Sequence, residues 1–176
     1  MNASPSAGAA GTSGTTAGTS GTTAGPGTQP AGRRARAAAI GALQAALAAE
    51  HAAVYGYGVA GAHLAGTRQA AAIRYWAAGQ AARDTLAAMV VSRGATPVAA
   101  STGYRLPFAV HGEQSAIALA AFLEDRVTAA YLTLVALTDT KLRLFGARGM
   151  QTAALRAAWW RGQTLAFPGL EVPAPG

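Results

Sequence analysis

Apolar side chains recur with a helical period through most of the chain after residue 32. In one run the steps alternate between three and four residues, which places all members on one face of a helix. This first seam consists of Leu43, Leu47, Glu50, Val54, Tyr57, Gly61 and Leu64. A second seam consists of Ile117, Ala120, Glu124, Val127, Tyr131, Leu134 and Thr138. Each seam therefore contains one charged residue, a glutamate.

Helical periodicity and helix-breaking residues together predict four helices, over about residues 34–65, 69–93, 114–139 and 140–163. The first and third connections are short, whereas the middle one, 94–112, carries two prolines and no helical period. Short connections are typical of antiparallel hairpins, and a long one is typical of a crossover along the length of a bundle. The sequence therefore predicts an all-α fold, a four-helix bundle with short-long-short connections.

Residues 1–32 have a different composition. They contain no charged side chain, and the heptapeptide AGTSGTT occurs twice, at 10–16 and 17–23. Such a segment cannot bury enough apolar surface to offset its loss of chain entropy. We expect a disordered tail over residues 1–32, a helical domain over 33–170 and a short C-terminal tail over 171–176.

The composition bears on partners and compartment. Hydrophobic residues make up 51% of the chain and charged residues only 12%. So few charges leave helix surfaces rich in Gly and Ala, and we expect a homodimer that buries some of them. The chain has no cysteine, which excludes disulfides and thiolate metal sites.

The sequence lacks the usual membrane signals and contains one short basic segment that could contact nucleic acid. The N-terminus lacks the basic start and apolar core of a secretory signal, and the longest uncharged stretch of the predicted helical domain, 51–67, is shorter than the roughly 20 apolar residues of a membrane span. We therefore expect a cytoplasmic protein without a membrane-spanning helix. The basic segment 33–36, RRAR, could contact nucleic acid, but no aromatic or further basic residue is interleaved with it. We interpret it as a solvated first helical turn.

The two glutamates belong to a repeated spacing. Glu50 is followed seven residues later by Tyr57, and Glu124 by Tyr131, so each pair lies on one helix face two turns apart. A buried carboxylate must be paired with a cation or become neutral, because an isolated buried charge costs several kcal/mol.

Two arginines could supply the pairing charge. Arg83 in the second predicted helix and Arg156 in the fourth are placed to point inward. We predict a buried polar network in which Glu50 and Glu124 pair with these arginines. The other interpretation is that both glutamates extend toward a solvated groove.

Several segments carry a resemblance to a known family. The stretches AEHAAVYGYGVAGAHL, ARDTLAAMVV, YRLPF, LEDRVTAAYLTLVA and FPGL lie within residues 42–170. Together they resemble an uncharacterised actinobacterial ferritin-like domain of unknown function, of the DUF4439 type. The resemblance implies a ferritin-like fold. In metal-binding ferritin-like proteins, single glutamates on the first and third helices combine with Glu-x-x-His on the second and fourth.

The second half of that ligand set is missing from this chain. The matching positions fall near Gln80 and Arg83 in the second helix and near Ala154 and Ala157 in the fourth. Iron or manganese needs about six oxygen and nitrogen donors, so two carboxylates alone form a poor site. The resemblance therefore implies a degenerate di-iron site.

From these residues we predict a protein that is not an enzyme and holds no cofactor, acting as a structural or interaction module. The alternative is an iron- or manganese-binding oxidoreductase or storage protein with an unorthodox carboxylate site. That site would use Glu50, Glu124, Asp84 and His51.

Overall fold

The computed structural model describes residues 31–165 and 168–170 and contains, over those residues, four α-helices and no strand. The helices are α1 (Ala31–Gly61), α2 (Gly66–Val91), α3 (Glu113–Val135) and α4 (Thr140–Arg161). The all-helical prediction is confirmed, and each predicted helix overlaps one observed helix. The predicted tails fall almost wholly outside the described residues.

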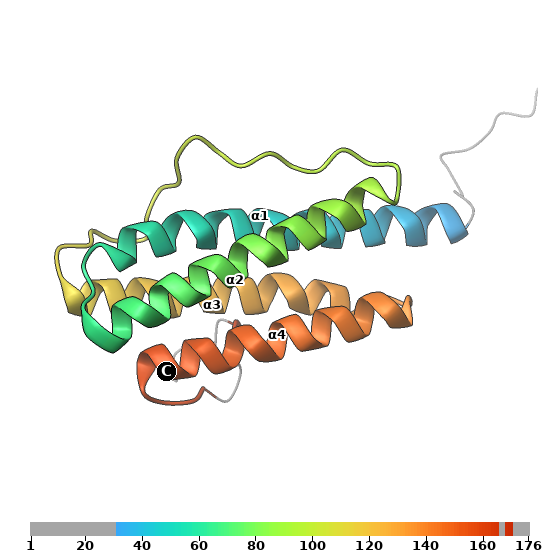
Figure 1. Cartoon of the computed structure of the whole chain (residues 1–176). Helices are drawn as coiled ribbons and strands as arrows, with labels where there is room; N and C mark the ends of the chain where they lie inside the picture. The colour runs from blue at the N-terminus through green and yellow to red at the C-terminus, as the bar shows by residue number, and fades with distance from the viewer. Residues whose placement is uncertain (1–30, 166–167, 171–176) are drawn as a thin grey trace, which may run out of the picture.

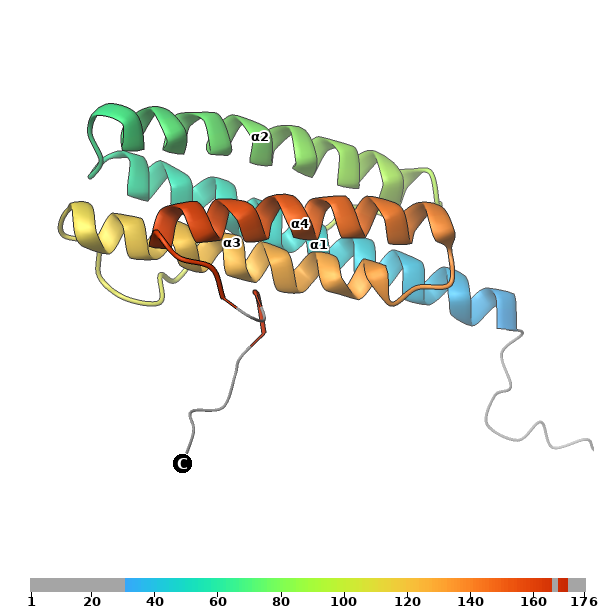
Figure 2. The same cartoon turned by 90° about the horizontal axis from the view of Figure 1, so that it is seen from below.

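The connections are short, long and short, as the sequence predicts. Helices α1 and α2 run antiparallel, and so do α3 and α4 (Figure 1). The crossover 92–112 returns along the molecule, so that α3 starts near the end of α1 and runs antiparallel to it (Figure 1). Helix α1 packs against both α2 and α3, and α3 packs against α4; the view from below shows the same pairs (Figure 2).

The core lies along the two predicted seams and is completed by α2 and α4. Its fully buried leucines come from three helices: Leu43 and Leu47 on α1, Leu86 on α2, Leu119 and Leu134 on α3. Much of the remaining core is alanine, which lets helix axes approach closely. Thr138, predicted as the last member of the second seam, is instead exposed, because α3 ends at Val135.

Glycine sets the contact between α3 and α4. A Cβ atom at Gly146 would lie 2.6 Å from the Leu134 Cβ and 3.0 Å from the Tyr131 carbonyl oxygen. No side chain fits in that space, so only glycine allows the two backbones to come so close. Asp139 fixes the start of α4, because its side chain accepts hydrogen bonds from the backbone N–H of Lys141 (2.9 Å) and Leu142 (3.2 Å).

The long crossover is held against α1 by side-chain hydrogen bonds. The Gln44 amide donates to the Thr96 carbonyl (2.6 Å) and accepts from the Val98 N–H (2.8 Å). His51 Nε2 lies 3.1 Å from the Val98 carbonyl. Further along, the Tyr104 ring contacts Tyr55 with centroids 5.4 Å apart. The crossover is therefore fixed along one side of α1.

Helix α1 is the one described helix that is long and apolar enough, by length and composition alone, to cross a membrane. Its most apolar window has a mean hydropathy of 1.3, and 33% of that window is buried by the rest of the protein. A core helix that packs on two neighbours has this composition as well.

Candidate functional site

The two seam glutamates are buried where α1 and α3 pack together. Glu50 is 6% exposed and Glu124 is 2% exposed. The Tyr131 hydroxyl donates a hydrogen bond to Glu50 Oε1 at 3.0 Å, and the Tyr57 hydroxyl donates to Glu124 Oε1 at 2.7 Å. Each tyrosine thus binds the glutamate of the opposite helix. The antiparallel direction of α1 and α3 explains this crossing, because it brings the tyrosine at the end of one spacing level with the glutamate at the start of the other.

Helix α4 extends this pair of contacts on the Glu124 side. Trp160 Nε1 donates to the Tyr57 hydroxyl at 2.9 Å, so this hydroxyl both accepts and donates. An Arg156 guanidinium nitrogen lies 3.7 Å from Glu124 Oε1, and the guanidinium stacks over the Tyr75 ring at 4.8 Å from its centroid. The structure therefore places Arg156, Glu124, Tyr57 and Trp160 in one connected network.

Helix α2 contributes no charge to Glu50. Gly79 faces the carboxyl, and a Cβ atom there would lie 3.4 Å from Glu50 Oε2. Arg83, one of the two arginines predicted to pair with the buried glutamates, instead forms an ion pair with Asp84 at 2.9 Å. Asp84 is adjacent and its side chain is 69% exposed, so the Arg83 guanidinium is paired without losing its contact with water. Arg83 was predicted to belong to the buried network, but the structure places it outside that network.

A small pocket opens beside Glu50 between α2 and α4. Its volume is about 280 Å³, and its polar lining comes from Glu50, Thr85, Tyr131, Arg148, Thr152 and Arg156. Glu50 therefore borders a groove, as the second interpretation of the sequence expects, although its side chain is almost fully covered. Glu124 does not line this pocket.

The buried carboxyls hold their protons more tightly than exposed ones. Burial raises the pKa of Glu50 to about 7, assisted by the charge of Glu124 and opposed by the Tyr131 hydrogen bond and by the charge of Arg156. Burial also raises the pKa of Glu124 to about 7, opposed by the Tyr57 hydrogen bond and by Arg156. Burial, together with the neighbouring glutamate, raises the pKa of both Tyr57 and Tyr131 as well. The phenols therefore stay protonated and act as donors.

Residues 42–172 match the family described as Domain of unknown function (DUF4439). The chain belongs to this family. A solved structure of similar fold is that of a conserved hypothetical protein, rv2844, from Mycobacterium tuberculosis. Its crystal structure has a TM-score of 0.69 and 29% sequence identity, covering 72% of this chain and 96% of that one. Among curated proteins, none matches this chain. Family membership therefore leaves the role of the buried network to be argued from its geometry.

The donor set of the network does not fit a di-metal centre. Glu50 and Glu124 each have one oxygen taken by a tyrosine hydroxyl, and Arg156 places a positive charge beside Glu124. Within residues 31–165 and 168–170, no group of three or more His, Asp or Glu is arranged to hold a metal ion. The other two predicted ligands lie elsewhere, since Asp84 pairs with Arg83 and His51 contacts the crossover.

The α4 positions where the resemblance would put missing ligands carry no donor, and Arg83, at one of the α2 positions, is a cation. Ala157 is fully buried and Ala154 is half-buried, both without a polar side chain, and the α2 residue that faces Glu50 is Gly79. Iron or manganese bound here would lack most of the six donors that it needs.

Sequence reasoning missed two residues of the network, Trp160 and Gly149. Trp160 lies one helical turn after Arg156, a spacing that puts both on one face, but the sequence alone did not say whether Trp159 or Trp160 points inward. Trp160 is 4% exposed and Trp159 is 47% exposed. Gly149 was missed because its role is to leave room: a Cβ atom there would collide with the Tyr131 ring.

Proposed function

We propose that this protein is a ferritin-like four-helix bundle whose centre has exchanged a metal site for a hydrogen-bonded network. In this proposal it is not an enzyme, holds no cofactor, and acts as a structural or interaction module. The helix directions support the ferritin-like assignment, since a long crossover between two antiparallel hairpins is the connection pattern of that fold.

The crossed Glu–Tyr hydrogen bonds carry the proposal. In a carboxylate metal centre the oxygens of both glutamates would face cations. Here Tyr131 and Tyr57 donate to those oxygens, and the guanidinium of Arg156 supplies the positive charge near Glu124. A network of this kind fixes the register of two helices, because each hydrogen bond is lost if one helix slides by a turn.

One observation favours the second candidate, a di-iron or di-manganese oxidoreductase or storage protein. Two carboxyls on neighbouring helices lie in one core, which is the arrangement that such a centre starts from. The two candidates differ in what a bound metal would do to stability, since a ligand that binds only the folded state raises the melting temperature by mass action.

Metal analysis separates the candidates. The full chain, purified without a histidine tag, is expected to contain less than stoichiometric iron or manganese, and added metal is expected to leave its melting temperature unchanged. A content of about two ions per chain, lost in Glu50→Gln or Glu124→Gln but kept in the surface control Glu113→Gln, would overturn the proposal in favour of the di-metal protein.

The proposal includes self-association in the cytoplasm. Several large apolar side chains are exposed on α2 and α4, including Ile73 at 60%, Leu155 at 64% and Trp159 at 47%. Leu155 and Trp159 lie one turn apart on the same face of α4, and adjoining exposed apolar side chains are typical of protein–protein interfaces, which supports a homodimer. Light scattering at high micromolar concentration tests this part, and a monomer there would contradict it.

No nucleic-acid role is included, although the segment 33–36 is exposed. Arg36 donates a hydrogen bond to the Arg93 carbonyl, so at least one of its three arginines has a structural contact. A salt-dependent retardation of DNA or RNA in a gel would reveal a partner of that kind.

A further inference from the structure

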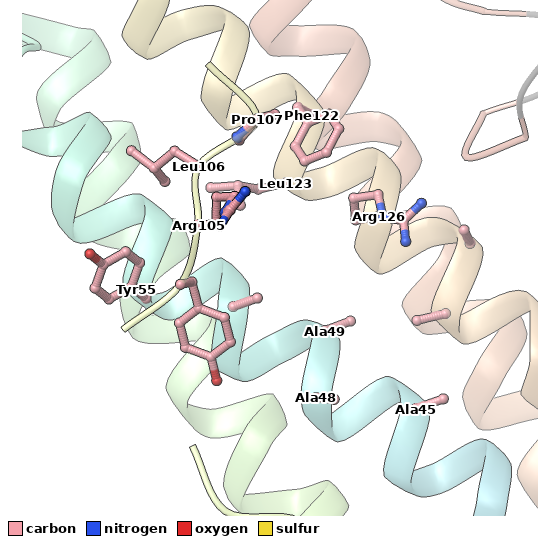
Figure 3. Close-up of a pocket in the computed structure, with 14 residues that line it drawn as sticks. Ala45, Ala48, Ala49, Tyr55, Arg105, Leu106, Pro107, Phe122, Leu123 and Arg126 are labelled. Carbon is pink, nitrogen blue, oxygen red and sulfur yellow. The ribbon is translucent and has the colours of Figure 1, made fainter. Parts of the chain in front are cut away.

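A second pocket, larger than the one beside Glu50, lies on the opposite face of α1 from Glu50. Its volume is about 520 Å³, and three elements form it: α1, α3 and the crossover segment 104–107 (Figure 3). A volume of this size falls in the range of small-molecule sites, about 300 to 1,000 Å³. This pocket shares no residue with the buried network.

The walls of the pocket are apolar and built from both local and distant parts of the chain. Alanines of α1, among them Ala45, Ala48 and Ala49, line one end of the pocket, and Phe122 of α3 lies beside Pro107 of the crossover at the other end (Figure 3). The small side chains of these alanines leave the volume open. Tyr55 and Phe122 are large, yet 40% and 38% exposed, so apolar surface here lacks a cover.

The crossover wall is held in place. Gln44 and His51 of α1 bind the crossover at residues 96 and 98, and the Ser101 N–H donates to the Tyr104 hydroxyl at 3.0 Å. Tyr104 in turn contacts the Tyr55 ring. These contacts keep the pocket formed without a ligand, which lowers the entropy cost of binding.

Two arginines from different elements border this apolar pocket. Arg105 belongs to the crossover and Arg126 to α3 (Figure 3). Neither forms an ion pair with any acidic side chain of the described residues, because all six of those acids contact other groups. The acids are Glu50 (Tyr131), Asp84 (Arg83), Glu113 (Arg68), Glu124 (Tyr57 and Arg156), Asp125 (Arg161) and Asp139 (Arg93 and the α4 N-terminus).

We propose that this pocket binds an amphiphilic carboxylic acid, with its apolar body between α1 and α3 and its carboxylate at Arg105 and Arg126. An apolar lining with two guanidinium groups at its border matches such a molecule in both shape and charge, since arginine forms charge-assisted hydrogen bonds with carboxylates. This assignment goes beyond the structural role proposed above and does not depend on it.

Decanoate, used below its micelle-forming concentration, is the probe, with decanol as its uncharged match. Calorimetric titration of the full chain is expected to give saturable binding of decanoate that is tighter than binding of decanol. The double variant Arg105→Gln/Arg126→Gln is expected to weaken decanoate binding about tenfold or more and to leave decanol binding within about twofold. Arg143→Gln, an exposed arginine of α4 outside this pocket, is the matched charge control and should change neither.

A second variant tests the apolar part without removing charge. Ala48 is exposed and lines the pocket, so Ala48→Leu should fill it while remaining compatible with the helix, and both probes should bind more weakly. Ala81→Leu, at an exposed alanine of α2, is the control for an added side chain.

Four results would overturn the assignment: no saturable binding, equal affinity for decanoate and decanol, binding insensitive to the two arginines, or an Ala48→Leu variant that changes oligomeric state and leaves probe binding intact. The last result would show that a second copy covers the groove.

Discussion

Glu50 and Glu124 occupy equivalent places on α1 and α3, and each accepts a hydrogen bond from the tyrosine of the opposite helix, yet their surroundings differ. Glu124 has Arg156 beside it, and its tyrosine is held by Trp160. Glu50 has one hydrogen bond and borders a pocket, where α2 presents Gly79. One sequence spacing therefore produces a well-supported carboxyl and a sparsely supported one.

The difference comes from the helices that do not carry the spacing. Helix α4 packs closely on α3 and brings a cation and an indole N–H to the Glu124 side of the core. The charge of Arg156 also acts on Glu50, but α2 faces that carboxyl with a glycine and brings it no charge. A buried carboxyl with few donors stays neutral more readily than it stays charged. We expect the two glutamates to respond differently to substitution, although burial raises the pKa of both to a similar value.

The largest expected effect is a loss of stability as the pH rises. The pKa of each carboxyl is about 7 in the folded protein against 4.5 for the ordinary group, so the folded state binds these protons more tightly. Their contribution to stability is complete below about pH 4.5 and is lost as the pH rises through 7, by about 3 kcal/mol for each carboxyl. Urea unfolding from about pH 5 to pH 8.5 measures it.

Single substitutions divide this pH effect between the two sites. Glu50→Gln and Glu124→Gln should each remove about half of the pH dependence, because each removes one titrating group. Glu113→Gln is the control, since Glu113 forms an exposed ion pair with Arg68. A wild-type stability that increases between pH 5 and pH 8.5 would contradict the raised pKa values.

Truncating the two glutamates should break their apparent equivalence. Glu124→Ala leaves the Arg156 guanidinium, 24% exposed, without its anion and removes the acceptor of Tyr57, so we expect a loss of about 3 kcal/mol at pH 7. Glu50→Ala removes a single hydrogen bond and should cost about 1 to 2 kcal/mol. Chemical denaturation compares both. The double variant Glu124→Leu/Arg156→Met should recover much of the larger loss, and equal losses for the two alanine variants would remove the distinction.

The tyrosines should show the same order with smaller effects. Tyr57→Phe deletes a hydroxyl that donates to Glu124 and accepts from Trp160, and should cost about 2 kcal/mol. Tyr131→Phe deletes one donor and should cost about 1 kcal/mol. Unfolding curves of both variants at pH 7 provide the comparison. A greater loss for Tyr131→Phe would mean that the Glu50 side is the better supported one.

The smallest effect concerns the space around Tyr131. Gly149→Ala places a methyl group against the Tyr131 ring and should displace its hydroxyl from Glu50, at a net cost of about 1 kcal/mol after the gain in helix propensity. Thermal unfolding of this variant, with Ala81→Gly as a control for propensity at an exposed site, measures it. A more stable Gly149→Ala variant would show that the ring can move without loss.

Much of the fold follows from local pattern, since helix period and connection lengths depend on neighbouring residues. The two seams predicted the buried faces of α1 and α3, including both glutamates. Helix ends were less accurate: the first predicted helix extends to residue 65, whereas α1 ends at Gly61. The predicted pairing of Arg83 with a buried glutamate was wrong, because the adjacent Asp84 offers Arg83 a partner that stays in contact with water.

The sequence by itself determined the four helices, the order of short and long connections, and the burial of two Glu–Tyr spacings, because a single helix decides which of its faces is apolar. Only the tertiary structure decided which tyrosine binds which glutamate, that Arg156 and Trp160 join the network, and that Gly79 faces Glu50. Those contacts depend on the direction and register of helices far apart in the chain. Register is set by close packing at positions such as Gly146, where a glycine admits a neighbouring helix, and no periodicity along one helix encodes its partner.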